Sequence, residues 1–168
     1  DDTFKIELIR LLGTQSPVGE QEFKDSSVEA LTEKVYENCY QSYQAKSTAI
    51  AQQAYPVIKD VFENQSATYE NIVIPFTDGL KTLQVVTNLK EAHKSEGKNI
   101  AESIEKSVTL AIIDDIWKEH LREMDDLKQA VQTASYEQKD PLLIYKFESF
   151  NLFKTLINKV NKDIVSFL

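Results

Sequence analysis

Two helical repeats on either side of a short polar connector dominate the second half of this 168-residue chain. In each repeat, apolar side chains recur at steps of three and four residues, which predicts an apolar face on a long helix. The first face consists of Leu110, Ile113, Trp117, Leu121, Met124, Leu127 and Val131. The second consists of Tyr145, Phe150, Phe153, Leu156, Ile157, Val160, Ile164 and Phe167. The spacing therefore predicts two helices, of which the first runs from about residue 104 to 134.

The connector between these helices is only five residues long, from Ser135 to Lys139. Asp140-Pro141 is a typical helix start, with an acceptor side chain at the cap and a fixed φ at the first turn. So short a connector forces neighbouring helices to pack along their lengths as an antiparallel hairpin. At 1.5 Å per residue the first helix would be roughly 45 Å long, with Tyr136 at the tip. Taken alone, such a tip is usually a solvated tyrosine without a task.

The first half of the chain reads as helices interrupted by a small sheet. A short helix is expected over residues 3–12, ending at Gly13, and a loop over 13–24. Ser26 and Glu29 fit a capping box, so a second helix is expected from there to about residue 62. Tyr36, Tyr40 and Tyr43 lie close together on it. We expect them to pack under a neighbouring loop rather than to form a stacking platform.

Two β-branched segments, 69–76 and 80–89, flank a Thr-Asp-Gly turn and predict a β-hairpin. Pro75 favours an edge position. The polar segment 90–99 is expected to be an exposed connector. The fold class that follows is mainly α: a helical region with a small β-hairpin, then a long antiparallel two-helix hairpin.

Charge and composition exclude several classes of function. The net charge of −8 argues against nucleic acid as a partner, because phosphate binding needs clustered Lys and Arg. The single cysteine, Cys39, allows neither an internal disulfide nor a structural zinc set. No apolar run approaches the ~20 residues that span a bilayer. The chain does not begin with methionine, and Met124 is its only one, so we expect a piece of a longer polypeptide.

No residue pattern predicts a catalytic, cofactor-binding or metal site. His120 lies beside Glu119 but has Met124, not a second ligand, four residues on, so we expect a histidine hydrogen-bonded at the hairpin surface or against another domain. The acidic pairs 114–115 and 125–126 are typical of a solvated stripe. The sequence contains no GxxxxGK[ST] phosphate loop, which predicts a chain that is not itself an ATPase.

One set of residues from the hairpin is more specific. The run WKEHLREMD at 117–125 is followed by Tyr136, by QKDP at 138–141, by Tyr145-Lys146 and by Glu148-Ser149-Phe150, with Phe153 three residues on. In order, spacing and identity these residues closely resemble the C-terminal helical region of SecA, the motor ATPase family of bacterial protein export. The resemblance covers about residues 110–167. The chain departs from it at Ala134, Ser135 and Ile144, where the family usually has arginine, glycine and glutamate.

The resemblance implies a division into a helical wing domain, residues 1–103, and a helical scaffold with a two-helix finger, residues 104–168. It implies a non-catalytic part of an export motor, whose finger contacts unfolded preprotein at the mouth of the SecYEG channel. The implied contact residues are Tyr136, Gln138 and Lys139. The residues expected to pack the hairpin are Trp117, Leu121, Met124, Tyr145, Phe150 and Phe153.

The resemblance also implies the surroundings of the chain. Its partners would be SecYEG, preprotein, the other SecA domains and, through the parent protein, the anionic membrane surface. ATP and Mg²⁺ would belong to the parent, and this part would hold no cofactor. The location would be cytoplasmic, at the inner face of the bacterial plasma membrane.

The alternative is an autonomous helical adaptor whose hairpin packs against a partner protein. The two interpretations differ in the residues on which binding depends. An adaptor should bind through an exposed apolar helix face with anchors at i, i+4 and i+7. A finger should depend on its tip.

Overall fold

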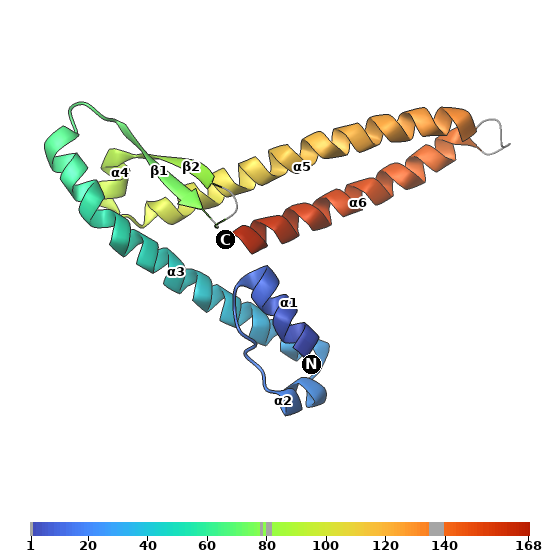
Figure 1. The fold of residues 1–168 in the computed structure, drawn as a ribbon, viewed down its shortest axis with the longest axis horizontal. Helices are drawn as coiled ribbons and strands as arrows, with labels where there is room; N and C mark the ends of the chain where they lie inside the picture. Colours follow the sequence, from blue (N-terminus) through green and yellow to red (C-terminus); the bar gives the residue numbers. More distant parts are fainter. Residues whose placement is uncertain (1, 78, 80–81, 135–139) are drawn as a thin grey trace. The chain divides into compact units, whose positions relative to one another are not determined.

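The computed structural model describes residues 2–77, 79, 82–134 and 140–168 (Figure 1). Its elements, in chain order, are α1 (Asp2–Leu12), α2 (Glu20–Asp25), α3 (Val28–Gln65), β1 (Asn71–Thr77), β2 (Thr82–Asn88), α4 (Leu89–Lys94), α5 (Asn99–Ala134) and α6 (Pro141–Phe167). They form two compact units: one reaches to Val108 and includes Ser166–Leu168, and the other is Thr109–Val165. The predicted fold class, mainly α with a two-stranded sheet and a long helical hairpin, is confirmed.

The first helix ends as predicted, because Gly13 adopts a left-handed φ of 60° and donates its N–H to the Ile9 carbonyl at 3.0 Å. The predicted loop over 13–24 is wrong at its end, where α2 forms. Phe23 of α2 packs on Phe4 of α1 with ring centroids 4.9 Å apart. Helix α2 is too short to be stable alone, and this tertiary contact stabilises it.

The start of α3 lies one residue later than predicted. Ser27, not Ser26, is the cap: its Oγ accepts a hydrogen bond from Ala30 N at 3.2 Å. Ser26 instead ends α2, with its N–H donated to the Glu22 carbonyl at 3.0 Å. The expected packing of Tyr36 and Tyr40 is also wrong, since both rings are exposed and stack on each other, with centroids 6.2 Å apart.

The predicted β-hairpin forms, with β1 and β2 antiparallel from the pair Asn71 and Asn88 to the pair Thr77 and Thr82. Burial alternates along both strands, as expected for a sheet with one covered face. Val85 of β2 is fully buried. Thr87 of the same strand accepts a hydrogen bond from Asn99 Nδ2 of α5 at 3.1 Å, which ties the sheet to that helix.

The predicted exposed connector over 90–99 is wrong. Asn88 caps α4 by accepting hydrogen bonds from Lys90 N and Glu91 N at 3.0 and 3.2 Å. Ala92 of this helix is completely buried. The polar residues of this segment conceal a helix that buries Leu89 and Ala92 and stacks the His93 ring on Phe62 of α3, with centroids 4.1 Å apart.

Unit 1 has a continuous apolar core between α3, β2, α4 and the first turns of α5. The core residues from these elements are Ala51, Ile58, Val85, Leu89, Ala92, Ile100, Ile104 and Val108. A polar contact also links α3 to α5 beside this core: the Tyr43 hydroxyl of α3 donates a hydrogen bond to the Glu105 carboxylate of α5.

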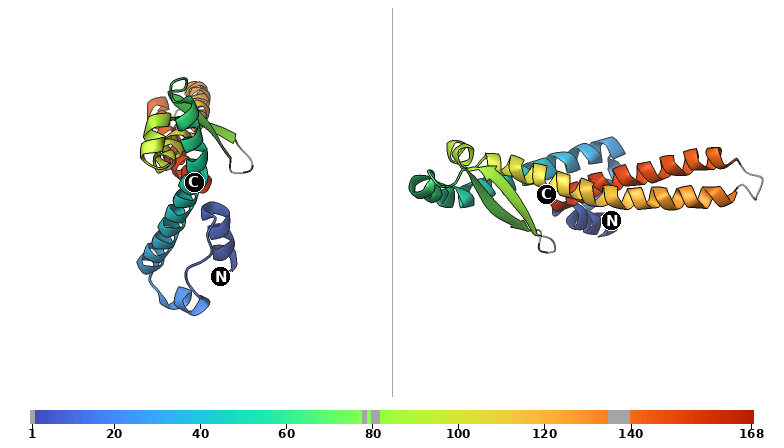
Figure 2. Two further views of the ribbon diagram at one scale, coloured as in Figure 1. Left: turned by 90° about the vertical axis from the view of Figure 1, so that its left-hand side faces the viewer. Right: turned by 90° about the horizontal axis from the view of Figure 1, so that it is seen from above.

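Unit 2 is the helical hairpin. Figure 1 and the right-hand view of Figure 2 both show α5 and α6 lying antiparallel and side by side. No helix among the described residues is both long and apolar enough to cross a membrane.

Candidate functional site

The predicted contact residues at the hairpin tip, Tyr136, Gln138 and Lys139, lie outside the described residues. The structure does describe the helix ends that flank them. α5 ends at Ala134, and α6 begins at Pro141, with Asp140 Oδ1 accepting a hydrogen bond from Leu142 N at 2.9 Å. The predicted Asp140-Pro141 helix start is therefore confirmed.

Behind the tip, buried side chains mark the seam between the two helices. The buried side chains are those of Ile112, Ile116, His120 and Val131 of α5 and Leu156 of α6. In α5 these positions recur at steps of four and eleven residues, which keeps them on one helical face. The seam makes the hairpin a packed two-helix unit.

The six residues predicted to pack the hairpin lie mainly at the margins of this seam. Met124 and Tyr145 are half-buried. The other four retain about half of their surface: Trp117 46%, Leu121 48%, Phe150 56% and Phe153 47%. Positions 113, 117 and 121 lie about 100° around α5 from the seam positions 112, 116 and 120, so a single partner helix covers only one of the two sets.

His120 lies inside the seam and not at the hairpin surface as predicted. Only 6% of the residue is exposed. Its ring lies between Trp117, with centroids 5.5 Å apart, and Phe153, with centroids 6.4 Å apart. Its Nδ1 is buried and has no hydrogen-bond partner among the described residues. Such an unpaired polar atom is uncommon in a protein core.

Exposed apolar side chains form a stripe along α6 that the sequence reasoning missed. Leu143, Phe147 and Phe150 are 52–62% exposed and follow one another at i, i+4 and i+7. With Lys146, Ser149 and Phe153 they line a shallow groove. We name Leu143, Phe147 and Phe150 the α6 stripe. Its spacing was visible in the sequence, but a helical period alone does not say which apolar residues face the partner helix.

Some charged groups of α5 form local ion pairs. Asp114 pairs with Lys118 one turn later, and Glu119 pairs with Arg122 at 2.8 Å. The bond to Asp114 raises the pKa of the exposed Lys118 ammonium. Among the described residues, no cluster of three or more His, Cys, Asp or Glu side chains could hold a metal ion.

Comparison with known proteins finds sequence matches over almost the whole chain. A family described as the SecA Wing and Scaffold domain matches residues 12–168. The protein translocase subunit SecA of Christiangramia forsetii is 54% identical over 165 residues. The proteins of the same name from Flavobacterium psychrophilum and Parabacteroides distasonis are 50% and 51% identical. No solved structure matches the chain.

These three relatives are much longer proteins. Each match covers 98% of this chain but only 15% of the relative. The similarity therefore concerns one region of the translocase subunit, and that region includes both structural units. Because the family match runs from residue 12 to residue 168 and so includes both structural units, this chain belongs to the SecA Wing and Scaffold domain family.

Proposed function

We propose that this chain is the wing and scaffold part of a SecA-type protein translocase. Residues 1–103 act as the helical wing domain and residues 104–168 as the scaffold with its two-helix finger. The tip, with Tyr136, Gln138 and Lys139, contacts unfolded preprotein at the mouth of the SecYEG channel. Tyrosine suits this role because its large amphipathic ring can contact many different sequences.

The observation that carries the proposal is the continuity of α5. Its 36 residues correspond to about 54 Å of unbroken helix. The first turns contribute Ile100, Ile104 and Val108 to the core of unit 1, and the later turns contribute Ile112 and Ile116 to the hairpin seam. A displacement of unit 1 would be passed to the hairpin without an intervening loop. This supports a finger that couples motion of the motor to the translocated polypeptide.

The chemistry that drives this motion belongs elsewhere in the translocase. ATP and Mg²⁺ would bind to its motor domains, and the wing and finger would contact those domains and hold no cofactor. We infer a cytoplasmic location at the inner face of the bacterial plasma membrane. Contact with anionic lipid would come from other parts of the translocase, because this chain has a net charge of −8.

Cross-linking tests the role of the tip. In a full-length translocase carrying this chain, Cys39 is replaced by serine and Tyr136 by cysteine, and an export substrate is arrested in the channel with ATP. We expect the Tyr136→Cys protein to cross-link to the substrate. The matched control is Glu148→Cys, at an exposed position of α6, which should not cross-link.

Two results would contradict the proposal. In one, the tip cysteine is reactive toward a small thiol reagent but never reaches the substrate. In the other, both positions cross-link equally, which would indicate nonspecific proximity.

The second candidate function is a helical adaptor that packs its hairpin against a partner protein. The α6 stripe favours it, since three large apolar side chains at i, i+4 and i+7 are the anchors that a partner groove recognises. Replacing Phe147 and Phe150 by serine separates the two candidates. An adaptor loses its partner when these two residues are replaced, whereas a finger keeps substrate cross-linking at residue 136 in the same variant. A finger loses transport when Tyr136 is replaced, even with the stripe intact.

A further inference from the structure

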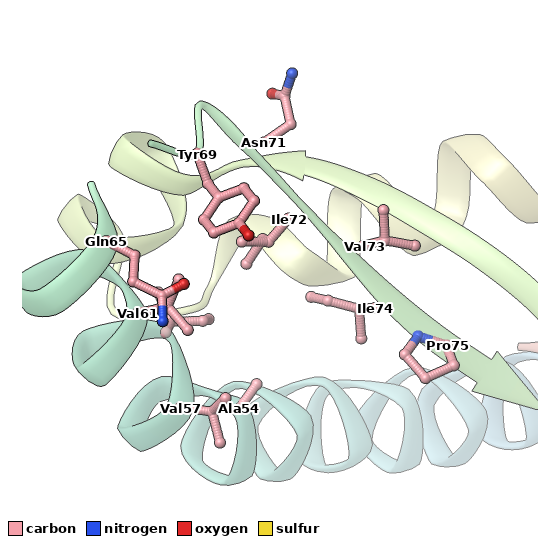
Figure 3. Close-up of a pocket in the computed structure, with 11 residues that line it drawn as sticks. Ala54, Val57, Val61, Gln65, Tyr69, Asn71, Ile72, Val73, Ile74 and Pro75 are labelled. Carbon is pink, nitrogen blue, oxygen red and sulfur yellow. The ribbon is translucent and has the colours of Figure 1, made fainter. Parts of the chain in front are cut away.

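An apolar groove in unit 1, far along the chain from the hairpin tip, has no assigned role. It lies between the C-terminal half of α3 and strand β1 and has a volume of about 630 Å³, within the range of about 300–1,000 Å³ typical of ligand sites. Figure 3 shows Val57 and Val61 of α3 facing Ile72 and Ile74 of β1 across it. Val57 is 65% exposed, so the floor of the groove is open to solvent.

The second wall of the groove is the free edge of β1. In the described residues β1 pairs with β2 alone, so its opposite edge has no strand partner. Figure 3 shows this edge lying over α3, with the side chain of Asn71 turned away from the helix. The backbone of β1 and the apolar side chains of α3 therefore border the same space.

The register of the sheet identifies which backbone groups point into the groove. Leu89 N donates to the Glu70 carbonyl at 2.9 Å, next to the pair Asn71 and Asn88. Hydrogen-bonded pairs alternate in an antiparallel ladder, so Ile72 and Ile74 direct their N–H and C=O groups to β2. The same groups of Asn71 and Val73 point the other way. Pro75, which has no N–H to donate, falls on this outward-facing set.

We propose that this groove binds an extended segment of unfolded polypeptide from another molecule, which adds as a strand to the free edge of β1. The outward N–H and C=O groups of Asn71 and Val73 are complementary to the backbone of a strand, and a helix has no free backbone groups to offer them. The apolar residues Val57 and Val61 would receive alternate side chains of the added strand. Backbone pairing makes such binding tolerant of sequence.

Pro75 limits the added strand. At Pro75 only the carbonyl can pair, so pairing is complete at Asn71 and Val73 and weakens toward Thr77. This inference goes beyond the proposed function, because it places a polypeptide-binding site in the other unit and requires no residue between 135 and 139.

The test uses the 168-residue chain and a fluorescein-labelled peptide of alternating valine and serine, as long as β1, with a lysine at each end. Binding is followed by fluorescence anisotropy, and amide hydrogen exchange is measured with and without peptide. We expect the amides of Asn71 and Val73 to exchange more slowly when the peptide is bound.

Two peptides methylated on the backbone nitrogen distinguish strand addition from nonspecific adhesion. One carries the methyl groups on every valine and the other on every serine. Neighbouring N–H groups of a strand point to opposite edges, so one set faces β1 and the other faces solvent. We expect one methylated peptide to lose binding and the other to retain it.

Matched variants of the chain test the groove itself. Val57→Asp places a charge on the apolar floor and should weaken binding by at least about tenfold. Val28→Asp is the control, since Val28 is also a strongly exposed valine on the same helix, 74% accessible, but lies outside the groove. Val73→Pro removes one outward N–H and should also weaken binding. Circular dichroism checks that each variant is folded.

Equal binding of both methylated peptides, or equal effects of Val57→Asp and Val28→Asp, would exclude strand addition at this groove. Sedimentation provides a further check. If the chain dimerises and Val73→Pro makes it monomeric, the groove is an interface between two copies and the proposal is wrong.

Discussion

At the scale of single residues, polar groups in the two packed regions differ in how they are satisfied. Tyr43 is half-buried and donates its hydroxyl hydrogen to Glu105, so the contact between α3 and α5 contains a satisfied pair. His120 is more deeply buried, between two aromatic rings, and its Nδ1 has no partner among the described residues. The two residues should therefore respond to substitution in opposite directions.

Replacing His120 by leucine should stabilise the hairpin. An unpaired buried polar atom costs about 1–3 kcal/mol, and an apolar side chain of similar size removes that cost, so we expect a gain of about 1 kcal/mol in the free energy of unfolding. Urea denaturation of the 168-residue chain measures it. His120→Gln keeps a polar group and should give no gain. A loss of stability in His120→Leu would contradict the assignment of an unpaired buried Nδ1.

Replacing Tyr43 by phenylalanine should destabilise unit 1 by about 1 kcal/mol, because the Glu105 carboxylate loses its donor. Partial burial, and then the hydrogen bond to Glu105, raises the pKa of Tyr43 above its ordinary value near 10. The corresponding contribution of Tyr43 to the free energy of unfolding is fully present below about pH 10. It is lost as the pH rises through the pKa of Tyr43 in the folded state.

The pH dependence gives the measurement for Tyr43. Urea unfolding at about pH 8 and about pH 11 should show a smaller alkaline loss of stability in Tyr43→Phe than in the parent chain. Tyr40→Phe is the control, because Tyr40 is 52% exposed and its ring stacks on Tyr36. Equal alkaline losses in all three proteins would contradict the assignment.

At the scale of elements, the packing of α4 on α3 depends on a close approach of two backbones. Gly97 follows α4 with a φ of +82° and donates its N–H to the Ala92 carbonyl at 2.8 Å. A Cβ at this position would lie 3.0 Å from the Ala51 carbonyl oxygen of α3. Glycine satisfies both the backbone conformation and the space.

Gly97→Ala should therefore lower the free energy of unfolding by about 1–3 kcal/mol, since alanine disfavours a positive φ and its methyl group meets a backbone oxygen. Gly19→Ala is the matched control. Gly19 has a φ of −78°, and a Cβ there would meet nothing within 4 Å, so a change within about 0.5 kcal/mol is expected. Thermal unfolding compares the two, and similar midpoints would contradict the close-packing argument.

At the scale of the whole molecule, one helix belongs to both structural units. The unit boundary falls at Val108 and Thr109, in the interior of α5, and no loop separates the units there. The core of unit 1 and the seam of unit 2 are built on successive turns of the same helix. The proposed coupling depends on this stretch of α5.

Breaking α5 at this boundary should uncouple the two units. Leu110→Pro removes one backbone hydrogen bond and clashes with the preceding turn, at a cost of about 3 kcal/mol. Leu110 is 69% exposed, so little packing is lost, and Leu110→Ala controls for the side chain. In a full-length translocase we expect Leu110→Pro to hydrolyse ATP while its transport of preprotein falls well below that of Leu110→Ala. Unchanged transport would contradict coupling through α5.

Elements with strong local signals could be predicted from the amino-acid sequence alone. These are the two long helices of the hairpin, the Asp140-Pro141 helix start, the end of α1 at Gly13 and the pairing of two β-branched segments. Each depends on side-chain period or on the conformational preference of a residue and its neighbours, which act over a few positions. The order and spacing of WKEHLREMD and the residues after it likewise indicated the family, because identity at so many positions is specific.

Burial of the apolar residues, by contrast, depends on how the elements pack in three dimensions. Trp117 and Phe150 belong to the apolar faces that helical spacing predicts, yet both lie beside the seam. His120, which belongs to neither face, lies within the seam. Likewise α4 resembles a polar connector in sequence, because its helix depends on a cap from Asn88 and on burial of Ala92. A helical period restricts a residue to a face of its own helix, but the position of the neighbouring element determines which face is buried.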